Sequence, residues 1–120
     1  MTNKLIAKRY SKAFIDNLTE KAYTSILKDI KYLNKTLTAT PECTKVINSF
    51  LFPLTERMEL ADEIIKNLEN KNIWNNLFKI LIQKHKFIII SDLLEEIEES
   101  ILTSRNQIKI RLKIAHKHSP

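Results

Sequence analysis

The sequence predicts an all-α fold, a six-helix bundle followed by a single orphan β-strand at the C-terminal end. Three observations carry this prediction. The 120 residues include no glycine and only three prolines, which favours helices joined by short polar connections. Apolar residues recur at helical spacing over most of the chain. The segment 73–87, IWNNLFKILIQKHKF, carries large apolar residues on two faces, as expected of a helix at the centre of a bundle.

The first helix is predicted to run from residue 3 or 4 to about residue 19, with two adjoining faces. One face consists of Ala7, Ser11, Phe14 and Leu18, and the other of Ile6, Tyr10, Ala13 and Asn17. The basic, acid-free residues 1–14 are also typical of a transit peptide. We expect a helix of the fold instead, because the pattern continues to Leu18 without a small-residue cleavage signal.

Three further helices are predicted before the central one, separated by prolines at 41 and 53. They cover 21–39, 42–52 and a segment that Thr55 is expected to cap. Their predicted inward positions are Ile26, Ile30, Leu33 and Leu37; Val46, Ile47, Phe50 and Leu51; and Met58, Ala61, Ile65 and Leu68.

Asn72 is expected to cap the central helix, and the cations of 84–86 are favourable at its C-terminal end. Residues 87–90 have strand propensity, yet we predict a helix there, since Ile90, Leu94, Ile97 and Ile101 continue the helical period. This sixth helix is expected to end near residues 104–105, with Asn106 as a left-handed stop.

The period then changes to two. Ile108, Ile110, Leu112 and Ile114 alternate with basic residues, which predicts a half-buried strand. A single strand cannot form a sheet. We therefore expect two parts, a helical bundle over 1–105 and, over 106–120, a linker with the first strand of a truncated C-terminal domain.

The composition excludes several classes of site. Without glycine, neither a P-loop nor a GxGxxG fingerprint can exist. Cys43 is the only cysteine, and His85, His116 and His118 lack the spacing of metal ligands. The acids of 95–99 are expected to form a solvated helix face. We therefore predict no cofactor, no metal site and no enzymatic activity.

The net charge of +6 suggests nucleic-acid binding until it is located along the chain. Residues 105–120 hold Arg105, Lys109, Arg111, Lys113 and Lys117 and no acid, so the remaining 104 residues are nearly neutral. A small basic helical module that binds nucleic acid through its ends remains the alternative function. Steep salt dependence of binding would distinguish it.

Three segments carry a family resemblance. IAKRYSKAFID (6–16), NNLFKILIQKHKF (75–87) and the tail IKIRLKIAHKHSP (108–120) follow one another as in the delta subunit of bacterial F-type ATP synthases, the family of the mitochondrial oligomycin-sensitivity-conferring protein. The chain resembles this family over its whole length. It departs where Lys84 replaces the usual Asn, where Lys86 replaces a frequent Arg, in lacking a glycine at the helix–strand junction and in lacking most of the second domain.

The resemblance implies a non-catalytic stator subunit without cofactor, metal or nucleic acid, peripheral on the cytoplasmic face of the bacterial plasma membrane. In this family the N-terminal bundle binds the amphipathic N-terminal helix of an alpha subunit between its first and fifth helices. The C-terminal domain binds the b subunit of the peripheral stalk. Carried over by motif position, the implied groove residues are Tyr10, Ala13, Asn76 and Ile80.

The residue pattern supports the same surface independently. These four positions lie on the second faces of the two helices that have more apolar surface than a core contact needs. Ala13 would let a partner helix approach closely, and Tyr10 offers contact area with a polar tip. The alternative is that all four are ordinary core residues.

Overall fold

The computed structural model describes the backbone of residues 2–117 and the side chains of residues 2–106. This part folds into six α-helices and two short 3-10 helices, and it contains no strand. The elements are α1 (Asn3–Asp16), η1 (Glu20–Ala22), α2 (Tyr23–Ala39), α3 (Pro41–Ile47), α4 (Leu54–Ile65), α5 (Lys71–Gln83), η2 (Phe87–Ile89) and α6 (Ile90–Lys117). The prediction of an all-α fold with six helices is confirmed.

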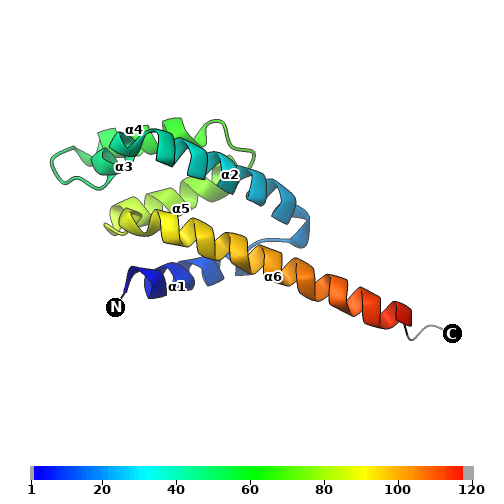
Figure 1. Ribbon diagram of the computed structural model, residues 1–120. Helices are drawn as coiled ribbons and strands as arrows, with labels where there is room; N and C mark the ends of the chain where they lie inside the picture. Colours follow the sequence, from blue (N-terminus) through cyan, green and yellow to red (C-terminus); the bar gives the residue numbers. More distant parts are fainter. Residues whose placement is uncertain (1, 118–120) are drawn as a thin grey trace.

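Helix α5 lies at the centre of the bundle (Figure 1). It packs against α4 on one side, while α1 packs along α6 on the other, and α6 also contacts α2. Trp74, Phe78 and Leu81 of α5 are completely buried. The apolar segment predicted to be central is therefore central, because its side chains pack against helices on both sides.

Helix α1 begins at its cap and buries one of its two predicted faces. The hydroxyl oxygen of Thr2 accepts a hydrogen bond from the N–H of Leu5 at 3.3 Å, which satisfies a donor of the first turn. Ala7, Ser11 and Phe14 are buried against the rest of the bundle. The adjoining face, with Tyr10 and Ala13, keeps access to solvent.

A buried carboxylate joins α2 to the connection between α4 and α5. Asp29 accepts hydrogen bonds from the backbone N–H groups of Glu69 and Asn70, at 2.9 and 3.0 Å, and from the Asn70 side-chain amide at 2.9 Å. The indole N–H of Trp74 donates a fourth bond at 3.0 Å. Four donors compensate the burial of this charge, so Asp29 fixes where α5 begins.

Helix α3 is shorter than predicted. It ends at Ile47, whereas the sequence pattern predicts a helix to residue 52, and Phe50 and Leu51 are 74% and 93% exposed rather than inward. The Ser49 hydroxyl accepts the N–H of Leu51 at 3.2 Å, a local bond that competes with helical hydrogen bonding. The Phe50 ring also packs on His85, with ring centroids 4.6 Å apart.

Two predicted caps are wrong. Helix α4 begins at Leu54 after Pro53, one residue before the predicted cap Thr55. Helix α5 begins at Lys71 after Asn70, so Asn72 lies inside the helix. The Asn70 side chain bonds to Asp29 and Ser25 instead of capping its own helix. The tertiary contact with α2 therefore decides the start of α5.

Helix α5 ends in a left-handed turn. His85 has φ 55°, and its N–H donates to the Ile82 carbonyl at 3.2 Å, while the N–H of Lys86 donates to the Leu81 carbonyl at 2.7 Å. This pair of bonds forms a Schellman motif, in which glycine usually takes the left-handed position. Since the chain has no glycine, histidine occupies it.

The final helix begins as predicted and continues further. Ile90, Leu94, Ile97 and Ile101 are all buried, and η2 leads into α6 without a strand at 87–90. The predicted stop at Asn106 and the predicted strand over 108–114 are wrong in this structure, because α6 continues to Lys117. No proline or glycine interrupts it, and a helix satisfies its own backbone without the partner strand that residues 2–117 do not supply. The domain boundary after residue 105 stays a prediction.

Candidate partner-binding groove

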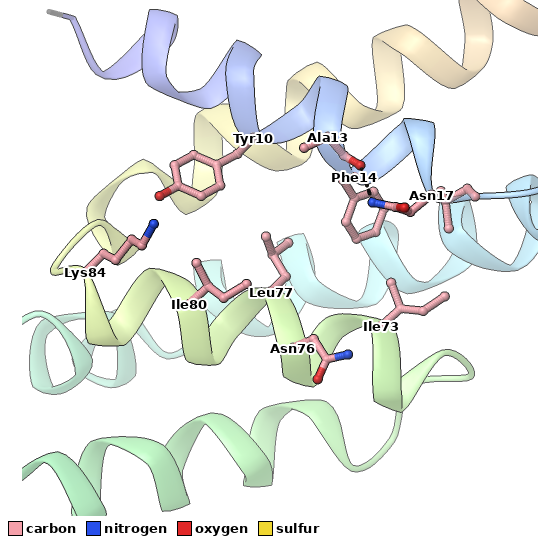
Figure 2. A pocket seen from close by; sticks show the side chains of 10 residues that line it. Tyr10, Ala13, Phe14, Asn17, Ile73, Asn76, Leu77, Ile80 and Lys84 are labelled. Atoms are coloured by element: carbon pink, nitrogen blue, oxygen red, sulfur yellow. Dashed lines mark hydrogen bonds between the residues drawn. The ribbon is translucent and has the colours of Figure 1, made fainter.

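The four site residues predicted from the sequence line one hollow on the surface. It lies between α1 and α5, has a volume of about 460 Å³ and is bordered by Tyr10 and Ala13 of α1 and by Asn76 and Ile80 of α5 (Figure 2). Six other residues complete its lining: Phe14, Asn17, Leu18, Ile73, Leu77 and Lys84. We call this hollow the α1–α5 groove.

None of the four residues is fully buried, although Tyr10 packs partly against the core. Ile80 is 42% exposed, Ala13 and Asn76 are exposed, and Tyr10 is half-buried. Figure 2 shows the Ile80 side chain directed from α5 toward α1, whereas Asn76 lies at the outer edge of α5. Ile80 and Ala13 therefore offer apolar surface to a partner, and Asn76 offers a polar amide at the border of the same surface.

The floor of the groove is apolar and held in place from below. Phe14 and Leu77 are buried, and the Phe14 ring lies 5.0 Å from the indole of the completely buried Trp74, at an interplanar angle of 37°. The Trp74 ring in turn meets Phe78 edge-on at 6.5 Å. The Phe14–Trp74 contact thus joins α1 to α5 beneath the hollow, and the Trp74–Phe78 contact within α5 supports the indole.

Helical spacing explains how each helix presents its groove residues. On α1, Tyr10 and Ala13 are three residues apart, next to the buried row of Ala7, Ser11 and Phe14. The amide of Asn17 donates to the Ala13 carbonyl at 2.9 Å, which closes the last turn of α1 beside the groove. This bond is drawn as a dashed line in Figure 2.

On α5, Ile73, Leu77 and Ile80 face α1 along one row, whereas Trp74, Phe78 and Leu81 point into the bundle. Ile73, Leu77 and Asn17 also line the groove but were not predicted from the sequence as groove residues. Their positions three or four residues from Ala13, Asn76 and Ile80 were the available signal.

A second hollow continues the groove at one end. It has a volume of about 450 Å³ and shares Tyr10, Ala13 and Lys84 with the α1–α5 groove. Its remaining lining residues are Ile6, Arg9 and Lys86. Figure 2 shows Tyr10 and Lys84 facing each other at this end, with Ile73 and Asn17 at the other. From the sequence, Lys84 and Lys86 were expected as cations that close the helix and as departures from the family motif, but not as residues of a site.

Metal-binding and membrane-spanning features were also sought among the described residues. Within this part of the chain no group of three His, Cys, Asp or Glu side chains is placed to hold a metal ion, and His85 packs its ring on Phe50. Among the helices that the structure describes, none is long and apolar enough to cross a bilayer.

Comparisons with known proteins give a consistent result. The family model described as ATP synthase delta (OSCP) subunit matches residues 6–119. A protein named ATP synthase subunit delta from Carboxydothermus hydrogenoformans is 25% identical over 119 residues, which cover 98% of this chain and 66% of the relative. A second protein of that name, from Wolinella succinogenes, is 28% identical over 104 residues, which cover 87% of this chain and 57% of the relative.

The chain thus spans slightly under two thirds of the first curated relative and less of the second. No solved structure gives a significant match. The family match covers both helices of the groove, from Ile6 at the start of α1 to the end of α5 and beyond.

Proposed function

The chain belongs to the ATP synthase delta (OSCP) subunit family, and from this we propose that it acts as a non-catalytic stator subunit that joins the catalytic head of the synthase to the peripheral stalk. Its helical bundle would hold the head by binding the N-terminal helix of an alpha subunit in the α1–α5 groove. It would act from the cytoplasmic face of the bacterial plasma membrane as a peripheral component of the complex.

One observation supports this proposal most strongly. Four residues from two helices more than sixty positions apart in sequence line a single apolar hollow with an ordered floor. A contiguous apolar surface on a soluble domain usually marks a partner site. An amphipathic helix laid into such a groove covers it with anchors spaced three and four residues apart.

The dimensions of the groove suit a helix of a few turns. Helix α5, which forms one wall, has 13 residues and is therefore about 20 Å long. A partner helix of about three to four turns would match this length and reach from Ile73 to Lys84. Exposed Ala13 leaves room for close approach at the middle of the groove.

The link to the stalk b subunit is part of the same proposal. It would depend on the C-terminal portion, for which the sequence pattern predicts a boundary after residue 105. Helix α6 passes through this position without a break. The boundary and the contact with the stalk are therefore to be tested together, by comparing the binding of the b subunit to residues 1–105 and to the whole chain.

The groove is tested by titrating the protein with a synthetic peptide of the alpha-subunit N-terminal residues, followed by calorimetry. Ala13→Asp should abolish measurable binding, because it places a charge in a desolvated contact. Lys12→Asp is the matched control, since Lys12 is exposed on the same helix but does not line the groove.

Helicity should be unchanged in both variants, because neither position is buried. If Ala13→Asp binds as well as the Lys12→Asp control, the groove is not the site. If the unaltered protein does not bind the peptide at all, the proposed function fails.

A further inference from the structure

We propose that the helix bound in the α1–α5 groove carries carboxylate side chains at the end that lies over Tyr10 and Lys84, and that these carboxylates set its register. This inference rests on the proposed function and specifies the chemistry of the partner. It concerns three cations, Arg9, Lys84 and Lys86, which we call the cationic end of the groove.

The cationic end is continuous with the apolar groove. Both hollows share Tyr10, Ala13 and Lys84, so a helix lying along α5 past Ile80 comes within reach of all three cations. Arg9 projects from α1 one residue before Tyr10, while Lys84 and Lys86 belong to the turn that ends α5. These two lysines flank His85, the left-handed residue of the turn, and both line the second hollow.

Within the described part of the chain, nothing neutralises these cations. No Asp or Glu lines either hollow, and the salt bridge found among these residues joins Lys66 to Glu63 on α4. Three like charges in one neighbourhood repel one another. A partner carboxylate placed among them relieves that repulsion and gains attraction, and partial shielding by the apolar groove reduces the screening by salt.

The opposite end of the groove has a different character. It is lined by Phe14, Asn17, Leu18 and Ile73, and no charged side chain of the described residues takes part in the lining there. A partner carboxylate meets no cation in the groove lining at this end, and the adjoining hollow beyond Ile73 holds one cation and one acid, Lys71 and Glu69. The groove is therefore asymmetric in charge, and this asymmetry distinguishes one register and direction of a bound helix from the others.

The inference is tested with designed peptides that do not depend on the alpha subunit. Three amphipathic helical peptides share one leucine-rich face and differ at three solvent-edge positions of one end, which carry Glu, Gln or Lys. The three peptides are made in two versions, with these positions at the N-terminal end or at the C-terminal end, because the direction of the bound helix is not known in advance. Affinities are measured by fluorescence anisotropy at about 20 mM and about 300 mM salt, where screening differs strongly.

The expected order of affinity is Glu over Gln over Lys, with about tenfold between Glu and Lys at the lower salt concentration and a smaller ratio at the higher one. The order should reverse for the combined variant Arg9→Glu, Lys84→Glu and Lys86→Glu. It should persist in the control Lys28→Glu, Lys31→Glu and Lys35→Glu. The control makes the same change in net charge at exposed positions of α2 that line neither hollow.

An unchanged order in the first variant, or a reversed order in the control, overturns the inference, because the charge effect would then be global. A dimer of the unaltered protein that dissociates on Ala13→Asp also overturns it, by assigning the groove to a second copy of the chain.

The alpha-subunit peptide separates the two proposals. Suppose that this peptide binds the unaltered protein, does not bind Ala13→Asp, and binds the Arg9→Glu, Lys84→Glu and Lys86→Glu variant with unchanged affinity. The stator function then stands and this inference fails. If only the designed peptides behave as expected, the inference stands and the identity of the partner fails.

Discussion

The ring of Phe14 in α1 lies 5.0 Å from the indole of Trp74 in α5, and this contact forms the base on which the groove rests. The same indole donates its N–H to the buried carboxylate of Asp29 in α2. Three helices are thus joined through one tryptophan. The spacing of α1 and α5, and with it the shape of the groove, depends on a carboxylate that lies outside the groove.

Asp29→Ala should lower the free energy of unfolding by about 3 kcal/mol, because it leaves the Trp74 N–H and two backbone N–H groups without their acceptor. Urea unfolding followed by circular dichroism measures this loss. Asp29→Asn is the matched control, since its amide keeps one acceptor oxygen of the same shape and should lose less. A negligible loss in Asp29→Ala would show that the carboxylate is not needed as the acceptor of these bonds.

Tyr10→Ala and Ile80→Ala should each weaken binding of the alpha-subunit peptide by about 1–3 kcal/mol, the range of interface anchors. Ile80 is 42% exposed in the free protein, so its truncation should change stability little. Calorimetry measures the affinity and thermal unfolding measures the stability. A loss of stability without a loss of affinity would assign these side chains to the fold instead of to the groove.

His85→Gly should be more stable than His85→Ala by about 1 kcal/mol, because only glycine takes the left-handed conformation without a steric penalty from Cβ. Both substitutions remove the ring contact with Phe50, so their difference isolates the backbone effect. Chemical denaturation of the two variants gives this difference. If alanine is the more stable of the two, as it is inside a helix, the turn at His85 is not left-handed.

Ile47→Ala should cost about 2–5 kcal/mol of stability, whereas Leu51→Ala should change it by less than about 0.5 kcal/mol. Ile47 is 1% exposed and Leu51 93% exposed, although the sequence pattern assigns both to the same buried helix face. Urea unfolding of the two variants compares them directly. Similar losses would mean that the loop after α3 packs against the bundle.

The sequence was sufficient to predict the helices whose faces repeat over several turns. Ile26, Ile30 and Leu33 in α2 and Leu94 and Ile97 in α6 are all buried, because each turn adds the same signal, while Leu37 at the end of the α2 row is half-buried. The end of α3 could not be found in this way. It depends on a hydroxyl bond of Ser49 and on the distant His85.

The strand over 108–114 was wrong for a related reason. Alternation describes which residues could face a sheet, but a strand also needs a neighbour to receive its hydrogen bonds, and α6 continues through this segment instead.

For the candidate site, the sequence and the family resemblance named four residues, and these line one hollow. Their binding of a partner stays a prediction. Asp29, which helps to fix the floor beneath them, could not be recognised, because its four donors come from the α4–α5 connection and from Trp74 of α5, 40 or more positions away. Arg9 and Lys86 were missed, because they line a hollow together only where the turn after α5 brings Lys84 and Lys86 beside α1.

The continuity of α6 has a mechanical consequence. Its first half is clamped in the bundle through Ile90, Leu94, Ile97 and Ile101, and the same helix continues outward to Lys117 (Figure 1). With 28 residues it forms a lever about 42 Å long. Residues 102–117, beyond the clamped half, account for about 24 Å of this length, so a tilt of about 5° at their base would displace the outer tip by roughly 2 Å. Any load applied at the tip is therefore transmitted as bending and torque into the α1–α6 contact, without a hinge to absorb it.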